Sequence, residues 1–135
     1  MAQAGTMESE KGKLLFLEDK KFIVDDFHKF IKRAGYDFLS TSDAEEALLV
    51  AEFEKPGAIL VDMALVDPGY DFLEELKKNI KIKNIPVVIL TDSDSEDERK
   101  KCERMGAAAY IARRGKTPGE ILRSVEAVIN KSGQI

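Results

Sequence analysis

Three short apolar runs in this chain end at side chains that could do chemistry. The runs and the residues that follow them are Leu14–Leu17 with Glu18-Asp19, Ala58–Val61 with Asp62, and Val87–Leu90 with Thr91. Runs of this length are typical of strands buried on both faces, and open parallel α/β sheets hold their chemistry where such strands end. Carboxylates gathered at one sheet edge repel each other unless a cation binds or a proton is retained. The pattern therefore predicts a polar site at this edge.

The composition limits the functions that such a site could have. The chain has 135 residues, with 21 basic and 25 acidic side chains and a net charge of −4. That length suits one domain, and the mild acidity argues against binding to nucleic acid. No apolar run is long enough to cross a membrane, and the first twelve residues lack the pattern of a signal peptide, so a cytoplasmic protein is expected. The single cysteine, Cys102, excludes an internal disulfide and falls in a helical pattern that predicts burial.

Strand and helix patterns alternate along the chain in a (βα)5 order. The predicted strands cover 14–17, 36–41, 58–61, 87–90 and 109–112, and the predicted helices cover about 20–34, 42–51, 71–79, 95–105 and 117–129. The apolar stripe of the first helix consists of Ile23, Phe27, Phe30, Ile31 and Ala34. This order predicts an α/β fold with a doubly wound, parallel, five-stranded sheet over residues 13–131. A disordered tail over 1–12 and a short tail over 132–135 are expected on either side.

Capping patterns support the predicted helix starts. A short polar residue stands three positions before a glutamate in each of four pairs: Ser42 and Glu45, Asp71 and Glu74, Ser95 and Glu98, and Thr117 and Glu120. In such a capping box, each of the two side chains accepts a hydrogen bond from the backbone N–H of the other residue. Because the boxes coincide with the starts that periodicity predicts, the order of elements is well supported.

These features together resemble the receiver domain of two-component response regulators. The resemblance covers about residues 13–130 and depends on motifs in a set order: Glu18-Asp19, Asp62, Thr91 and Gly106-Ala107-x-x-Tyr110. No single motif is specific, but their order and spacing within a (βα)5 chain are. The resemblance implies a flavodoxin-like strand order of 2-1-3-4-5.

The resemblance also implies a single-domain response regulator with defined site residues. Asp62 would accept a phosphoryl group, Thr91 would hydrogen-bond that group, and Tyr110 would reorient on activation. Mg²⁺, or Mn²⁺, would be held by Glu18, Asp19, Asp62 and the backbone carbonyl of Ala64. A histidine kinase or a phosphotransfer protein would supply the phosphoryl group. An output protein would bind the face of the fourth helix, fifth strand and fifth helix, and the protein would be no enzyme beyond self-phosphorylation and autodephosphorylation.

The implied chemistry is consistent with the residue types. A carboxylate can act as a nucleophile toward phosphorus. Attack by Asp62 would bring negatively charged oxygens into a pocket that is already acidic. A hard divalent cation with oxygen ligands removes that penalty, and Mg²⁺ keeps several waters while it binds a few carboxylates and a phosphate.

Three positions near the predicted site depart from the family pattern. Arg113 falls where receivers place a lysine, and Arg114 follows it in place of a proline. Asp92 stands directly after Thr91, where the family usually carries a small residue, and it would oppose an incoming phosphoryl group or pair with Arg113. A planar guanidinium is no neutral replacement for an ammonium group. These departures are expected to affect the conformational change on phosphorylation more than they affect metal binding.

The missing proline leads to a prediction about the loop over residues 113–116. The lysine–proline bond of receivers is commonly cis, and a cis bond before a residue other than proline costs about 2.5–4 kcal/mol. We therefore predict a trans Arg113–Arg114 bond and a displaced loop. In that loop the Arg113 side chain would leave the phosphate pocket or pair with Asp92.

Other functions remain as alternatives. The first is a pseudo-receiver, which would act as a phosphorylation-independent interaction module, and Arg113, Arg114 and Asp92 favour it. A flavin-binding protein would need a loop rich in glycine and hydroxyl groups where Glu18-Asp19-Lys20-Lys21 stands. An aspartyl hydrolase of the haloacid dehalogenase type would need a second aspartate at Ala64. Both enzyme classes are therefore disfavoured.

Further charged residues lie on the predicted helices. His28 is expected to be a solvated helix residue. The basic residues of the fourth helix are expected to contribute to the partner-binding face: Arg99, Lys100, Lys101 and Arg104.

Overall fold

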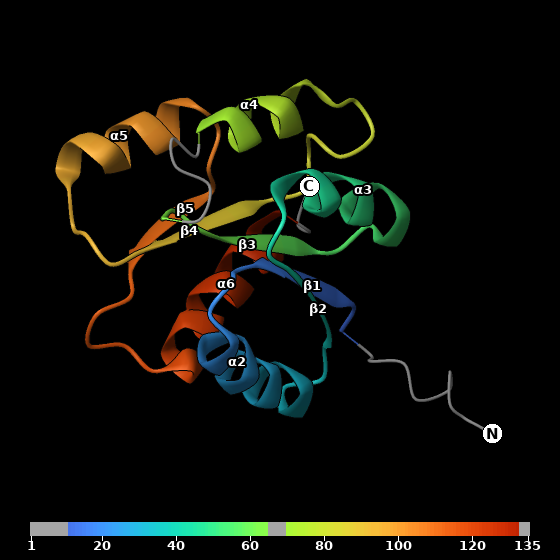
Figure 1. Ribbon diagram of the computed structural model, residues 1–135, viewed down its shortest axis with the longest axis vertical. Coiled ribbons are helices and arrows are strands. Elements are labelled where there is room, and N and C mark those ends of the chain that lie inside the picture. Colours follow the sequence, from blue (N-terminus) through green and yellow to red (C-terminus); the bar gives the residue numbers. More distant parts are fainter. Residues whose placement is uncertain (1–10, 65–69, 133–135) are drawn as a thin grey trace.

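The computed structural model describes residues 11–64 and 70–132, which form a parallel sheet between two layers of helices (Figure 1). The strands are β1 (Lys13–Leu17), β2 (Asp37–Thr41), β3 (Ala58–Asp62), β4 (Val87–Thr91) and β5 (Ala109–Ala112). The helices are α2 (Lys21–Arg33), α3 (Ala44–Glu54), α4 (Tyr70–Lys78), α5 (Glu96–Arg104) and α6 (Pro118–Ser132). The strand order is β2-β1-β3-β4-β5, and all four pairings are parallel. The predicted fold class and strand order are therefore confirmed.

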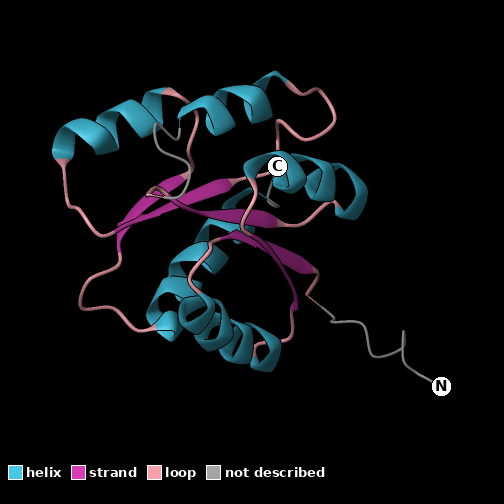
Figure 2. Ribbon diagram, viewed as in Figure 1, coloured by secondary structure: helices cyan, strands magenta, loops and turns pink. Residues whose placement is uncertain are grey.

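The sheet separates two apolar cores, with α3, α4 and α5 on one face and α2 and α6 on the other (Figure 2). Alternate residues of a strand point to opposite faces. In β1, for example, Leu15 and Leu17 join the first core while Leu14 and Phe16 join the second. Because both faces are covered, the central strands consist almost wholly of apolar residues up to the positions where the polar side chains begin.

Three details of the predicted helices are wrong. Helix α4 already includes Tyr70, so Asp71 lies in its first turn and not at its cap. Phe30 is 40% exposed, because Phe27 and Ile31 occupy the buried face of α2 and Phe30 lies beside them toward solvent. The capping residue of α3 is Asp43 instead of Ser42, and its carboxylate accepts a hydrogen bond from the Glu45 backbone N–H at 3.0 Å. Since α3 begins at Ala44, Ser42 stands one position outside the cap.

The last predicted capping box is confirmed in full. The Thr117 backbone N–H donates to Glu120 Oε1 at 2.8 Å, and the Glu120 backbone N–H donates to Thr117 Oγ1 at 3.1 Å. The box at the start of α5 is different, because Ser95 Oγ accepts from the Glu98 backbone N–H at 3.2 Å while the Glu98 carboxylate is directed toward the sheet.

Some sequence predictions lie outside the described residues. These are most of the expected tail over 1–12, most of the tail over 132–135, and most of the loop between Asp62 and Asp71. Lys11, which is described, donates its backbone N–H to the Gly35 carbonyl at 3.2 Å and lies 3.7 Å from the Glu126 carboxylate. Across the described ranges, none of the helices has both the length and the apolar character that a bilayer-crossing segment requires.

Candidate functional site

The polar residues of the site are placed by hydrogen bonds that continue the sheet just beyond its strands. The donor and acceptor pairs are Glu18 N–H to Thr41 O at 3.0 Å, Met63 N–H to Leu90 O at 2.8 Å, and Arg113 N–H to Thr91 O at 2.8 Å. The strand register aligns the same ends, since Asp62 lies beside Leu90 and Thr91 beside Ala112. Apolar strands of matched length therefore bring the acids, the hydroxyl and the arginine to one edge.

Asp62 opens onto a cavity that it shares with a second acid. The cavity has a volume of about 310 Å³ and is lined by Asp19, Lys20, Asp62 and Ala64. The Asp62 side chain is only 3% exposed, and its Oδ1 accepts a hydrogen bond from the Ala64 backbone N–H at 3.0 Å. Asp19 and Asp62, two of the predicted metal ligands, therefore line the same cavity as Ala64, whose carbonyl is a further predicted ligand.

Glu18 is buried, interacts with Asp62, and is not among the residues that line this cavity. Its Oε2 accepts hydrogen bonds from the backbone N–H groups of Asp19 and Lys20, at 3.0 and 3.2 Å, and its Oε1 accepts from Arg113 Nη1 at 3.0 Å. Burial raises the pKa of the Glu18 carboxyl, and interaction with Asp62 adds to that rise, which the Lys20 N–H and Arg113 offset only in part. Glu18 is therefore an acid whose lone pairs are largely used within the protein.

Arg113 contacts three carboxylates at once. Its Nη2 lies 3.0 Å from Asp92 Oδ1 and 4.0 Å from Asp62 Oδ2, and its Nη1 binds Glu18. The side chain is 13% exposed. Burial lowers the pKa of the guanidinium, but the hydrogen bonds to Asp92 and Glu18 outweigh burial and the net shift is upward. The predicted pairing with Asp92 is confirmed, whereas departure from the pocket is not, and the geometry of the Arg113–Arg114 bond stays a prediction.

The donor set suits a hard cation that keeps much of its water. Among the described residues, no three His, Cys, Asp or Glu side chains converge as a group that could hold a metal ion. Asp19 and Asp62 face the same cavity, while Glu18 is bound to Arg113. Two carboxylates and a backbone oxygen match the way that proteins bind Mg²⁺, with few protein ligands and several waters.

A second cluster joins Thr91 and Tyr110 through α5. Glu98 Oε1 accepts a hydrogen bond from Tyr110 Oη at 2.5 Å and a longer one from Thr91 Oγ1 at 3.4 Å. Tyr110 Oη also lies 3.1 Å from the Ser93 carbonyl, and the Arg99 guanidinium lies 5.0 Å from the centre of the Tyr110 ring. Burial raises the pKa of Tyr110 to about 12, and the hydrogen bond to Glu98 contributes to the rise. Sequence reasoning identified Glu98 only as a capping residue.

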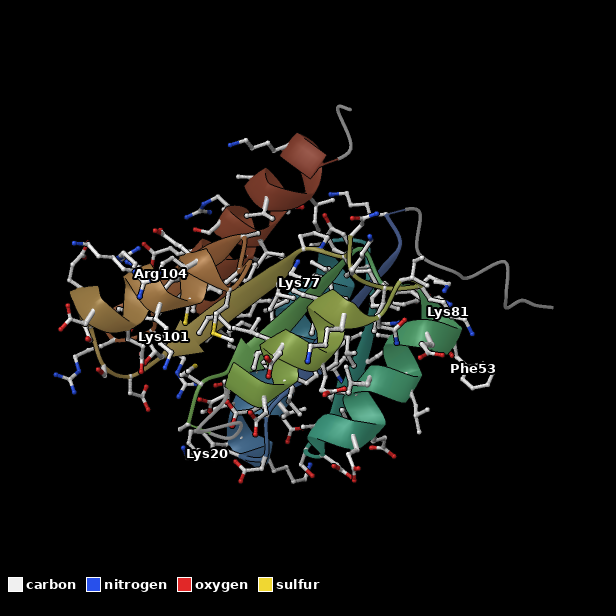
Figure 3. All side chains as sticks on the ribbon, turned by 90° about the horizontal axis from the view of Figure 1, so that it is seen from above. Lys20, Phe53, Lys77, Lys81, Lys101 and Arg104 are labelled. Carbon is white, nitrogen blue, oxygen red and sulfur yellow. The ribbon has the colours of Figure 1, made fainter. Side chains whose placement is uncertain are left out.

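The remaining sequence candidates have simpler surroundings. His28 is exposed and stacks on the Phe38 ring with centroids 5.2 Å apart, and Cys102 is the residue of α5 that is fully buried in the core. Figure 3 shows Lys101 and Arg104 along α5 and Lys77 on neighbouring α4. Unlike these basic residues, Arg99 contacts Tyr110 and is therefore part of the cluster around Glu98.

Comparison with known proteins agrees with this geometry. The family model described as the response regulator receiver domain matches residues 14–126. The chain is 34% identical over 121 residues to the alkaline phosphatase synthesis transcriptional regulatory protein PhoP of Bacillus subtilis (strain 168), which covers 89% of this chain and 49% of that protein. This chain spans about half the length of the curated relatives that it matches.

Solved structures match the fold at lower identity. The chemotaxis protein CheY4 of Vibrio cholerae superposes with a TM-score of 0.78 at 23% identity, covering 87% of this chain and 98% of that chain. The receiver domain of the sensor histidine kinase PA1611 from Pseudomonas aeruginosa PAO1, which has a magnesium ion coordinated in its active-site cleft, gives a TM-score of 0.75 at 24% identity, covering 88% and 98%. Because the family model spans all five strands almost completely, this chain belongs to the response regulator receiver domains of two-component signalling.

Proposed function

We propose that this receiver domain accepts a phosphoryl group on Asp62 from a histidine kinase or a phosphotransfer protein. The observation that carries the proposal is a nearly buried carboxylate that still opens onto a cavity, beside a second carboxylate and 4.0 Å from a guanidinium nitrogen. In the transfer, an Asp62 oxygen would bond to phosphorus, the bond from phosphorus to the donor histidine nitrogen would break, and the histidine would keep the electron pair and take up a proton. Residues 13–131 form the proposed functional unit.

Mg²⁺, or Mn²⁺, is the proposed cofactor of this transfer. Asp19, Asp62 and the backbone carbonyl of Ala64 would hold the ion, and Glu18, which interacts with Asp62, would add negative charge to the site. When bound, the ion would offset the repulsion between the phosphoryl oxygens and the carboxylates. The magnesium ion in the active-site cleft of the PA1611 receiver domain supports this choice.

The metal proposal has its own test. Calorimetric or NMR titration of the protein with Mg²⁺ should show weak saturable binding that perturbs residues around Asp19 and Asp62. The double variant Asp19→Asn with Asp62→Asn should lose that binding. Saturable binding that survives both substitutions would place the ion elsewhere.

The proposed output surface is the face of α5, β5 and α6. Lys100, Lys101 and Arg104 on α5 are exposed, which suits a protein partner with an acidic surface. Tyr110 connects this face to the site, because its hydroxyl shares Glu98 with Thr91. A change at Asp62 would therefore reach the partner surface through the Thr91 side chain.

The second candidate is a pseudo-receiver that binds its partner without phosphorylation. Two observations favour it. Arg113 already binds Asp92 and Glu18, and the hydroxyl groups of Thr91 and Tyr110 already have an anionic acceptor in Glu98. The cluster is thus satisfied in the structure without a phosphoryl group.

Intact-mass measurement separates the two candidates. Treatment with acetyl phosphate and Mg²⁺ should add one phosphoryl mass to the wild-type chain and none to Asp62→Asn, while Asp71→Asn serves as a matched control on an exposed acid. Labelling that persists in Asp62→Asn would move the acceptor to Asp71 or to Asp67, which lies outside the described residues. A wild-type chain that several donors fail to label would support the pseudo-receiver.

A further inference from the structure

Glu98 occupies a position where its carboxylate has two possible uses. It is the third residue of α5 after the capping residue Ser95, just as Glu120 is the third residue of α6 after Thr117. Glu120 completes its capping box by accepting from the Thr117 backbone N–H at 2.8 Å. Glu98 instead accepts from Tyr110 Oη at 2.5 Å. The same local motif therefore serves helix capping in α6 and a tertiary contact in α5.

The tertiary contact holds Tyr110 from two directions. Glu98 binds the hydroxyl at one end of the ring, and the Arg99 guanidinium lies 5.0 Å from the ring centroid. Arg99 Nη1 also lies 3.4 Å from the Tyr110 carbonyl oxygen. Because Tyr110 is only 5% exposed, these two residues of α5 leave the phenol little freedom to rotate.

The same carboxylate also reaches the residue that would bind a phosphoryl group. Thr91 Oγ1 lies 3.4 Å from Glu98 Oε1, and both side chains line a cavity of about 180 Å³. Ala64 borders this cavity and also the cavity of Asp62. A threonine hydroxyl carries a single proton, so a hydrogen bond given to Glu98 cannot be given to a phosphoryl oxygen at the same time.

We propose that Glu98 is a positioning residue for phosphoryl acceptance, because it holds Tyr110 inward and competes with the phosphoryl group for the Thr91 hydroxyl. Before transfer, the hydroxyl groups of Thr91 and Tyr110 both donate hydrogen bonds to Glu98. After transfer, the Thr91 hydroxyl donates to a phosphoryl oxygen, and Glu98 accepts a hydrogen bond from Tyr110 only. The positioning of Tyr110 by Glu98 depends only on the contacts of α5, whereas the competition for the Thr91 hydroxyl rests on the proposed phosphoacceptor function of Asp62.

The first test follows Tyr110 and needs no phosphoryl group. Glu98→Gln keeps the shape of the side chain without its charge, and Glu98→Ala removes it. Asp97→Asn is the matched control, since it removes one exposed acid from the same turn of α5. By NMR of ring-labelled tyrosine, the Tyr110 phenol should titrate at a lower pH in both Glu98 variants and at the wild-type pH in the control. A Tyr110 titration that is the same in all of these proteins would overturn the positioning role.

The second test measures the rate at which acetyl phosphate labels Asp62 in the presence of Mg²⁺. Glu98→Gln should label about fivefold faster than wild type, the size of effect expected from one hydrogen bond. The Asp97→Asn control should label at the wild-type rate. Glu98→Gln should give no acceleration in a Thr91→Val background, because valine has no hydroxyl for Glu98 to hold.

The outcomes of the two tests can be told apart. An unchanged rate in Glu98→Gln, or an acceleration that persists with Thr91→Val, would overturn the competition for Thr91. A wild-type chain without any labelling would instead overturn the phosphoacceptor function and the competition together, and the Tyr110 titration would still decide the positioning role. The glutamine variant retains the side-chain shape, so it decides both tests even where the alanine variant unfolds.

Discussion

Arg113 binds Asp92 through two nitrogen atoms of its guanidinium, with Nη2 at 3.0 Å and Nε at 3.3 Å from Asp92 Oδ1. Its remaining nitrogen, Nη1, lies 3.0 Å from Glu18 Oε1. From the sequence, Asp92 and Arg113 are both expected to depart from the family pattern. The structure pairs these two side chains, so the charge of each is offset by the other.

This pairing predicts the effect of Arg113 on metal binding. In Arg113→Ala, Glu18 and Asp62 lose their nearest positive charge, so Mg²⁺ should bind about tenfold more tightly, as expected for one partly screened charge. Without metal, the same variant should be less stable by about 1–3 kcal/mol, because the buried Glu18 carboxyl loses a hydrogen-bond donor. Calorimetric titration and urea unfolding with and without Mg²⁺ measure both effects.

Arg114→Ala is the matched control for that prediction, since Arg114 is exposed. It should change neither the Mg²⁺ affinity nor the stability appreciably. Equal or weaker Mg²⁺ binding by Arg113→Ala would show that Arg113 supports the ion instead of repelling it.

Tyr36 makes the stability of the protein sensitive to alkaline pH. Burial and a 2.9 Å hydrogen bond to Glu126 Oε2 raise its pKa from 10.0 to about 12. Because the folded state holds the phenolic proton more tightly than the unfolded chain, this contribution to stability is complete below pH 10 and is lost as the pH rises toward 12. Unfolding by urea at pH values across this range should show the decline.

Absorbance titration of tyrosinate provides the direct readout. Tyr36 and Tyr110 should both ionise near pH 12 in the folded protein. Tyr36→Phe should remove one of these late ionisations and flatten the decline in stability. A Tyr36 phenol that ionises near pH 10 in the folded state would contradict the predicted linkage.

Gly106 ends α5 with a backbone conformation that other residues rarely adopt. Its φ is +100°, and a Cβ atom at this position would lie 2.8 Å from Lys77 Cε. Gly106→Ala should therefore lower the free energy of unfolding by about 1–3 kcal/mol through backbone strain and the displacement of Lys77. Thermal or urea unfolding measures the loss.

Two other glycines separate the causes of that loss. Gly115 has a φ of +79° with open space around it, so Gly115→Ala should show the backbone strain alone. Gly57 has an ordinary φ and only a van der Waals contact with Lys13, so Gly57→Ala should be the mildest of the series. Equal losses at all of these positions would rule out the close contact with Lys77 as a contributor.

Cys102 should be unreactive until the protein unfolds. The residue is fully buried, and burial raises the pKa of its thiol, so the reactive thiolate is scarce in the folded state. A thiol reagent should label the native protein at a rate that follows the opening equilibrium and rises with urea. Rapid labelling of the native chain at neutral pH would show that Cys102 is accessible.

The sequence predicted the edge of the sheet where the site lies because the signals are local. An apolar run that stops at Asp62 or Thr91 marks a strand end, and parallel strands place such ends together. The direction in which a long side chain points depends instead on contacts with residues that are far away in the sequence. Arg113 reaches Glu18 across 95 positions of the chain, and no spacing rule connects the two.

Glu98 shows the same limit within a single motif. In the sequence, its capping box is indistinguishable from that of Glu120, yet only Glu120 binds the N–H of its capping residue as predicted. The difference arises because α5 packs where the hydroxyls of Thr91 and Tyr110 face its first turn, whereas the Glu120 carboxylate is bound by its own capping residue, Thr117. Phe30 was misplaced for a related reason, since periodicity defines the stripe of a helix more broadly than the face that packing finally buries.

The order β2-β1-β3-β4-β5 has a consequence for how the site forms during folding. The neighbours β1 and β3 are separated along the chain by α2, β2 and α3, so Asp19 and Asp62 meet only after a long loop has closed. The unfolded chain therefore has no version of this site, and any ion or phosphoryl mimic that binds there adds its binding free energy to the stability of the whole domain. Binding of an ion or a phosphoryl mimic in the cavity of Asp19 and Asp62 can therefore be measured as a rise in melting temperature, with the Asp62→Asn variant as the reference.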